Sequence, residues 1–185
     1  MKNLILGITG SIAAYKAADI TNLLKQNDFN VNVVMTKSST SFITPLTMQA
    51  LSKNIVYVDV LQEDTPSEIV HIDLAKKASC ILIAPATANI IGKIASGIAD
   101  DMLTSIVLAA NKIPKFIAPA MNNNMYANPI VQENLNKLKE HGWIIIEPRT
   151  SLLACGDYGK GALATVDDIV NCVLQKLEQN NDLVN

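Results

Sequence analysis

The chain has 185 residues, of which 49% are hydrophobic and 17% charged, and its formal net charge is −2. A chain of this size and composition can bury a core without disulfides or a structural metal, and it is not typical of a disordered protein. Because acidic residues slightly outnumber basic ones and aromatic residues make up only 4%, nucleic acid is a poor candidate partner.

The scarcity of cysteine and histidine limits the possible chemistry further. The three cysteines, Cys80, Cys155 and Cys172, have no paired spacing, and the chain has only two histidines. We therefore expect no disulfide framework, no metal site and a cytoplasmic location. The apolar run at the start is interrupted by glycine and threonine, and no run reaches the ~20 residues of a membrane span, so we expect neither a signal peptide nor a membrane segment.

In chain order, short apolar runs alternate with segments of helical spacing. The runs predict buried strands at residues 4–6, 31–35, 80–84, 115–118 and 143–146. The helical spacing predicts helices at residues 13–24, 90–99, 102–110, 130–140 and 166–177. This alternation predicts an α/β fold: one doubly wound parallel sheet, Rossmann-like or flavodoxin-like, with helices on both faces. We expect residues 1–178 to form this domain, with a glycine-rich loop at residues 150–161 and a frayed tail at residues 179–185.

Ligands of such sheets bind beyond the carboxyl ends of the strands, where the segment Gly-Ile-Thr-Gly-Ser-Ile occupies residues 7–12. Its glycines permit close approach of a ligand, and Ser11 can cap the helix that follows. An ordinary β–α turn remains the alternative. Because hydroxyls and a lysine at residues 36–39, not an acidic residue, follow the second strand, the sequence favours a mononucleotide over NAD.

Two later segments also carry polar side chains after a strand. Thr87 and Asn89 stand at the start of a helix, where the dipole favours an anion, although a tightly packed, capped helix explains them equally well. Three asparagines at residues 122–124 lie between two methionines. They are either a turn-forming loop or amides that bind a carboxylate through their NH2 groups.

The remaining candidates are single reactive side chains. Cys155 lies in a glycine-rich stretch and is a candidate for chemistry, whereas Cys80 and Cys172 lie in apolar patterns and are predicted to be buried and inert. His71 begins a short predicted helix, where its role is either structural or that of a base. It is a better candidate base than His141, which we expect at a helix carboxyl end.

Together these segments resemble the homo-oligomeric flavin-containing cysteine decarboxylases, from residue 1 to about residue 177. The most specific signals are His-Ile-Asp-Leu at residues 71–74, Pro-Ala-Met-Asn-Asn-Asn-Met-Tyr at residues 119–126, and Ala-Cys-Gly-Asp at residues 154–157. Tyr126 stands where this family usually has tryptophan. Lys76 lies where relatives can have a basic residue, but a solvated lysine is the simpler interpretation.

The resemblance implies FMN as the cofactor and a trimer, often assembled into a dodecamer, with FMN near a subunit interface. It implies an acid/base role for His71, orientation of the substrate carboxylate by Asn122, and proton donation by Cys155. The implied substrate-binding residues are Ala120, Met121 and Asn122. The implied cofactor-binding residues are Gly10, Ser11, Ile12, Thr36, Ser38, Phe42, Thr87, Ala88 and Asn89.

Within the family, the resemblance implies decarboxylation of 4′-phosphopantothenoylcysteine to 4′-phosphopantetheine in coenzyme A biosynthesis. The implied steps are thiol oxidation, CO2 loss and re-reduction of the enethiolate. A separate phosphopantothenate–cysteine ligase is a candidate partner that would supply the substrate. Two alternatives are a peptidyl-cysteine decarboxylase that releases an enethiol, and a non-catalytic flavin-binding regulatory subunit.

Overall fold

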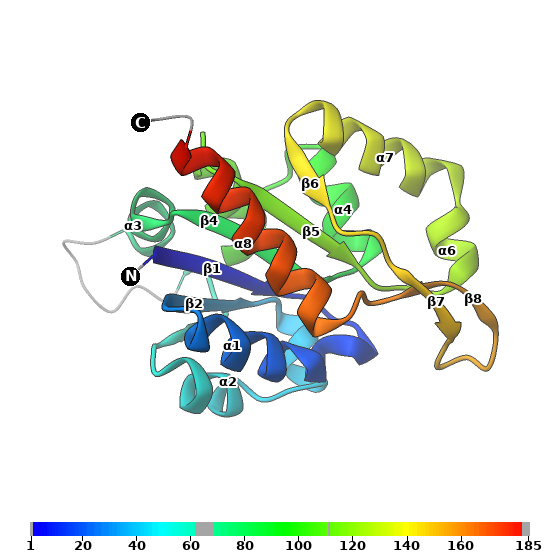
Figure 1. Ribbon diagram of the computed structural model, residues 1–185, viewed down its shortest axis with the longest axis horizontal. Helices are drawn as coiled ribbons and strands as arrows, with labels where there is room; N and C mark the ends of the chain where they lie inside the picture. The colour runs from blue at the N-terminus through cyan, green and yellow to red at the C-terminus, as the bar shows by residue number, and fades with distance from the viewer. Residues whose placement is uncertain (1, 62–68, 111, 183–185) are drawn as a thin grey trace.

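The computed structural model describes residues 2–61, 69–110 and 112–182 of the chain. Its centre is a parallel sheet with the strand order β3-β2-β1-β4-β5-β6 (Figure 1). The strands are β1 (Lys2–Ile8), β2 (Phe29–Met35), β3 (Val56–Tyr57), β4 (Cys80–Ala86), β5 (Lys115–Pro119) and β6 (Trp143–Ile145). All neighbouring pairs in this sheet are parallel, which confirms the predicted doubly wound architecture.

Helices cover both faces of the sheet because the strands are apolar on both sides. One buried cluster joins the sheet to α1 (Ala17–Gln26), α2 (Pro45–Ser52) and α8 (Val166–Asp182). The other joins it to α3 (Val70–Lys77), α4 (Ala88–Ala95), α5 (Met102–Ala109) and α7 (Pro129–Glu140). The described residues also form three short helical elements: the 3-10 helices η1 (Ile12–Lys16) and η2 (Lys37–Ser41), and α6 (Asn123–Ala127).

The glycine-rich segment predicted as a loop contains an antiparallel hairpin, β7 (Arg149–Leu152) and β8 (Tyr158–Ala162). Its side chains are largely exposed, so its strands have no hydrophobic pattern to detect. The hairpin is stabilised by backbone contacts instead: the Met121 amide donates to the Gly161 carbonyl oxygen at 2.9 Å. A Cβ on Gly161 would overlap the Met121 carbonyl oxygen. Strand β8 therefore needs glycine at this position to lie beside residues 119–126, which we call the asparagine segment.

Several helix ends also differ from the sequence prediction. Helix α4 stops at Ala95, four residues early, and Gly97 just beyond it has a left-handed φ of 70°. Helix α8 continues to Asp182, so residues 179–182 are helical where a frayed tail is predicted, and residues 183–185 of that tail lie outside the described residues. Strand β3 was not predicted, because it has only two residues, both half-buried, and no longer apolar run marks it in the sequence.

The histidine and cysteine predictions have mixed outcomes. His71 lies in the first turn of α3 and His141 caps the carboxyl end of α7, as predicted. Cys80 is buried, and its burial raises the pKa of its thiol to about 12. Cys172 is only partly buried, which corrects the prediction of full burial, although desolvation still raises its thiol pKa. No helix in the described part of the chain is long and apolar enough to cross a membrane.

Candidate active site

A cavity of about 450 Å³ opens at the carboxyl ends of β1, β2 and β4. Strand order reverses there, because β1 lies between β2 and β4, and such switch points are the usual ligand sites of open α/β sheets. We call it the Thr36 cavity. Its lining residues are Thr9, Gly10, Thr36, Lys37, Ser38, Thr87, Ala88, Asn89, Ile90, Lys93, Asp101 and Met125. It thus brings together six of the residues predicted to bind the cofactor.

The Thr36 cavity contains a buried hydroxyl without a partner. The Oγ1 atom of Thr36 is buried and has no hydrogen-bond partner among the described residues. Beside it, the backbone of Gly10 approaches Ser38 so closely that a Cβ on Gly10 would lie 2.6 Å from the Ser38 Cβ. Burying a hydroxyl costs free energy unless the hydroxyl makes a hydrogen bond. A polar ligand in the cavity that bonded to Thr36 would recover this cost.

The loops around this cavity are fixed to each other by Thr9. Its buried hydroxyl donates to the Pro85 carbonyl oxygen at 2.7 Å and accepts from the Thr87 amide at 3.0 Å. The Thr87 side chain in turn caps α4 by accepting from the Ile90 amide at 3.4 Å. The amino end of α4 therefore faces the cavity, where its dipole favours an anion such as a phosphate.

Two lysines contribute to this cavity in different ways. Lys93 is bonded to Asp100 at 2.7 Å and to Asp101 at 3.2 Å, and the hydrogen bond to Asp100 is the main cause of its raised pKa. Lys37 makes no ion pair with any described acidic residue. Lys37 is therefore the cation in this cavity whose charge is free for a ligand.

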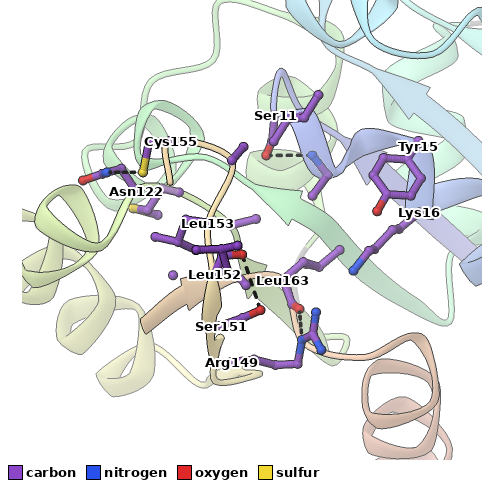
Figure 2. Close-up of a pocket in the computed structure, with 17 residues that line it drawn as sticks. Ser11, Tyr15, Lys16, Asn122, Arg149, Ser151, Leu152, Leu153, Cys155 and Leu163 are labelled. Carbon is purple, nitrogen blue, oxygen red and sulfur yellow. Dashed lines mark hydrogen bonds between the residues drawn. The ribbon is translucent and has the colours of Figure 1, made fainter. Parts of the chain in front are cut away.

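A second cavity of about 440 Å³ lies between η1, the segment after β5 and the β7–β8 hairpin (Figure 2). We call it the Cys155 cavity. It is lined by Ser11, Ile12, Ala13, Tyr15, Lys16, Ala120, Met121, Asn122, Arg149, Ser151, Leu152, Leu153, Ala154, Cys155, Gly161, Ala162 and Leu163. All three residues predicted to bind substrate line it, together with Cys155. Because Gly10 and Ser11 are consecutive, one turn borders both cavities.

Asn122 and Cys155, which are 33 residues apart, are in contact in this cavity. The Asn122 Nδ2 donates to the Cys155 Sγ at 3.3 Å, and Figure 2 shows the two side chains facing each other. The Asn122 Oδ1 accepts from the Asn124 amide at 2.8 Å, which caps α6. Since this bond fixes the oxygen, the NH2 group is directed toward Cys155. The thiol of Cys155, exposed at the hairpin turn, donates to Asp157 Oδ2 at 3.4 Å.

A charged cluster fixes the asparagine segment beneath β8. The buried Tyr126 donates its hydroxyl to Glu147 Oε2 at 2.9 Å, and Lys160 Nζ lies 2.8 Å from the same oxygen. Burial, followed by the Glu147 hydrogen bond, raises the pKa of Tyr126 to about 12. The hydrogen bond from Lys160 is the main cause of the lowered Glu147 pKa. The hydroxyl that distinguishes this tyrosine from the family's tryptophan therefore has a structural partner.

Two predicted site residues line neither cavity. Phe42 is 46% exposed at the end of η2. His71 is half-buried on α3, and its Nδ1 is buried without a hydrogen-bond partner among the described residues. Figure 1 shows α3 at the opposite end of the molecule's long axis from the β7–β8 hairpin. A single copy of the chain therefore does not bring His71 to Asn122 and Cys155.

The structure also adds residues that the sequence motifs did not indicate. Lys16 and Arg149 line the Cys155 cavity, whereas Asp157, which accepts from the Cys155 thiol, belongs to the motif at residues 154–157. Arg149 is the chain's one arginine, but nothing in its sequence spacing connects it with Lys16. Within the described ranges, no group of three or more His, Cys, Asp and Glu side chains is placed to hold a metal ion.

Comparisons with known proteins identify the family of the chain. Residues 1–178 match the family model described as Flavoprotein. A protein of Streptococcus mutans named "Probable phosphopantothenoylcysteine decarboxylase" is 51% identical over 179 residues, which are 96% of this chain and 98% of that protein. A Bacillus subtilis protein named "Coenzyme A biosynthesis bifunctional protein CoaBC" is 51% identical over 91% of this chain. This chain spans only 41% of that bifunctional relative.

Solved structures give the same result. One is a cysteine-to-serine mutant of a PPC decarboxylase complexed with pantothenoylaminoethenethiol, which has a TM-score of 0.85, 34% identity, and coverage of 96% of this chain and 98% of its own. Another is SpaF, described as an FMN-dependent cysteine decarboxylase, with a TM-score of 0.83, 30% identity and the same coverage. The chain belongs to the Flavoprotein family.

Proposed function

We propose that this chain is an FMN-dependent phosphopantothenoylcysteine decarboxylase of coenzyme A biosynthesis, a carboxy-lyase that produces 4′-phosphopantetheine. The observation that carries the proposal is the contact between Asn122 and Cys155 in a cavity that adjoins an anion-suited one. The near-full-length identity of 51% to a protein named for this activity supports the same substrate.

FMN fits the residues of the two adjoining cavities. The phosphate of a flavin mononucleotide suits the Thr36 cavity, which supplies the unpartnered Thr36 hydroxyl, Lys37 and the amino end of α4. Ser11 and Ile12, next along the shared turn, line the Cys155 cavity and are the residues we expect beside the flavin ring. The solved neighbours described as FMN-dependent or FMN-binding support this cofactor over other nucleotides.

When bound, FMN supplies a two-electron acceptor for the thiol-bearing carbon of the substrate and later returns the same two electrons. The NH2 group of Asn122 donates to the substrate carboxylate and holds it beside Cys155. After the thiol carbon is oxidised, the electron pair left by departing CO2 delocalises onto sulfur and gives an enethiolate. Cys155 then donates a proton to this product as it is reduced, and Asp157 orients the thiol. The net reaction is redox-neutral.

We infer that His71 acts in the site of a neighbouring subunit. Its Nδ1 is buried and unpartnered among the described residues, while α3 lies far from the Cys155 cavity of the same chain. Ile69 beside it, 53% exposed, and Leu108 on the adjacent helix α5, 62% exposed, offer apolar surface for a subunit contact. A homotrimer, alone or within a dodecamer, would pair each His71 with another subunit's cavity. Sedimentation analysis of the purified chain tests this assembly.

We further propose a cytoplasmic location, which the three unpaired cysteines support, and a separate ligase that joins phosphopantothenate to cysteine. The relatives named as bifunctional proteins of coenzyme A biosynthesis support the proposed ligase, because this chain covers less than half of their length and the rest of each relative is left for a second activity. The loop cysteine in contact with Asn122 suits an enzyme that completes the reduction.

Replacement of Cys155 by serine tests the function directly. The Cys155→Ser variant should retain FMN and release CO2 from 4′-phosphopantothenoylcysteine, yet accumulate the oxidised enethiol, which mass spectrometry detects. Cys172→Ser is the matched control, because Cys172 lies on α8 and lines neither cavity. A wild-type protein without flavin absorbance or CO2 release would refute the function, and normal saturated product from Cys155→Ser would refute the role of the thiol.

A further inference from the structure

Two cations border the Cys155 cavity at the end away from the Asn122–Cys155 contact. Figure 2 shows Lys16 on η1 and Arg149 at the start of β7 on this side of the cavity. The Arg149 Nε donates to the Leu163 carbonyl oxygen at 2.9 Å, which anchors the base of the guanidinium. Its two terminal nitrogens make no hydrogen bond to any residue that the structure describes, so their four N–H donors remain for a ligand.

The charges of these two side chains are uncompensated within the cavity. No lining residue is acidic, and neither cation forms a salt bridge with a described residue. Desolvation and the Arg149 charge lower the pKa of Lys16, against a smaller raising effect of Asp19. Two like charges that share a partly desolvated cavity repel each other. An anion bound between them would attract both cations and offset this repulsion.

We propose that Lys16 and Arg149 bind the phosphate of the substrate, while Asn122 and Cys155 act on its cysteine end. This inference rests on the proposed function, because it assigns one end of the same substrate. An arginine fork can make two parallel hydrogen bonds to phosphate, and the lysine adds a point charge. The pair makes the enzyme selective for phosphorylated over dephosphorylated pantothenoyl compounds.

The other free lysines are less suitable. Lys37 lies in the Thr36 cavity, which the proposed function assigns to the phosphate of FMN. Lys76, five residues after His71 on α3, lines neither cavity of its own chain. Because the proposed assembly brings α3 with His71 to the site of a neighbouring subunit, Lys76 on the same helix is the direct competitor for the phosphate.

Calorimetric binding to the FMN-loaded protein tests the assignment without turnover. The ligands are 4′-phosphopantetheine and pantetheine, which differ only in the phosphate and lack the carboxylate that the reaction removes. We expect the wild type to prefer the phosphorylated ligand by about a hundredfold or more, since each of the two cations contributes about tenfold or more. Lys16→Gln and Arg149→Gln should each reduce that preference by about tenfold to a hundredfold, the usual range for a hydrogen bond to a charged group. Lys137→Gln, on the exposed side of α7, is the control.

Two results would overturn the proposal: a wild-type protein that binds both ligands equally, or a preference that survives both substitutions and is lost in Lys76→Gln. A substitution that weakens both ligands equally also overturns it, because that pattern reports damage to the cavity instead of phosphate recognition. CO2 release by the wild type is measured separately, so failure of this assignment is distinguishable from failure of the proposed function.

Discussion

Gly161→Ala should separate the hairpin from the asparagine segment. The added Cβ would overlap the Met121 carbonyl oxygen and would lie 3.3 Å from the backbone of Asn122 and Asn123. Because these atoms belong to the backbone, no side chain can rotate away, and β8 itself must shift. The shift weakens the 2.9 Å hydrogen bond from the Met121 amide to Gly161.

The expected cost combines overpacking, ~1–3 kcal/mol, with the loss of one backbone hydrogen bond, ~1 kcal/mol. For a domain of this length, a free-energy loss of ~2–4 kcal/mol lowers Tm by roughly 5–15 °C. The shift also moves Cys155 away from Asn122, whose 3.3 Å contact spans the two segments. The variant should therefore release more enethiol relative to saturated product than the wild type.

Gly92→Ala is the matched control. Its added Cβ would have only the Asn134 Nδ2 nearby, at 3.8 Å, and Gly92 lies inside α4, where alanine is the better helix former. This variant should gain ~0.5–1 kcal/mol and keep the wild-type product. Thermal melting and product mass measure both effects. If Gly161→Ala melts with the wild type and makes only saturated product, the hairpin is not positioned by this close approach.

Two further substitutions test the cofactor cavity and the charged cluster. Thr36→Val removes the unpartnered buried hydroxyl, so the cofactor-free protein should be at least as stable as the wild type while FMN binds about tenfold more weakly in a fluorescence titration; unchanged FMN affinity would contradict the assignment. Tyr126→Phe should cost ~1 kcal/mol at pH 7 in urea unfolding. Since the folded pKa of Tyr126 is raised to about 12, its contribution is present below the unfolded value near 10 and is lost as pH rises through 12; the phenylalanine variant should lack this decline.

The sequence predicted the parallel sheet well because that part of the fold depends on buried apolar strands. Five of its six strands, all but β3, coincide with predicted runs rich in buried apolar residues, and the alternation of these runs with helices indicates parallel pairing. The β7–β8 hairpin was missed for the opposite reason. It is stabilised by backbone pairing and by glycines that permit close approach, and its exposed side chains show no periodic pattern.

The lining of the candidate site could be predicted where polar residues directly follow a strand. Thr36, Thr87 and Asn122 follow β2, β4 and β5, and they line the two cavities. Their assignment to a flavin came from the family resemblance, because hydroxyls and amides in such turns also serve as caps. Lys16 and Arg149 were not predicted as site residues, because two like charges that are far apart in the chain leave no spacing pattern in a single sequence.

The hairpin connects the two ends of the proposed reaction. Cys155 lies at its turn and Arg149 at its base, so the same element carries the thiol proposed to complete the reduction and the donor proposed for the substrate phosphate. Gly161 and the Glu147 contacts of Lys160 position it against the asparagine segment. A substrate without phosphate would thus lose a contact that holds it along the hairpin toward Cys155. Selectivity for phosphate and completion of the reduction should consequently weaken together in Gly161→Ala, whereas Cys155→Ser should impair only the second.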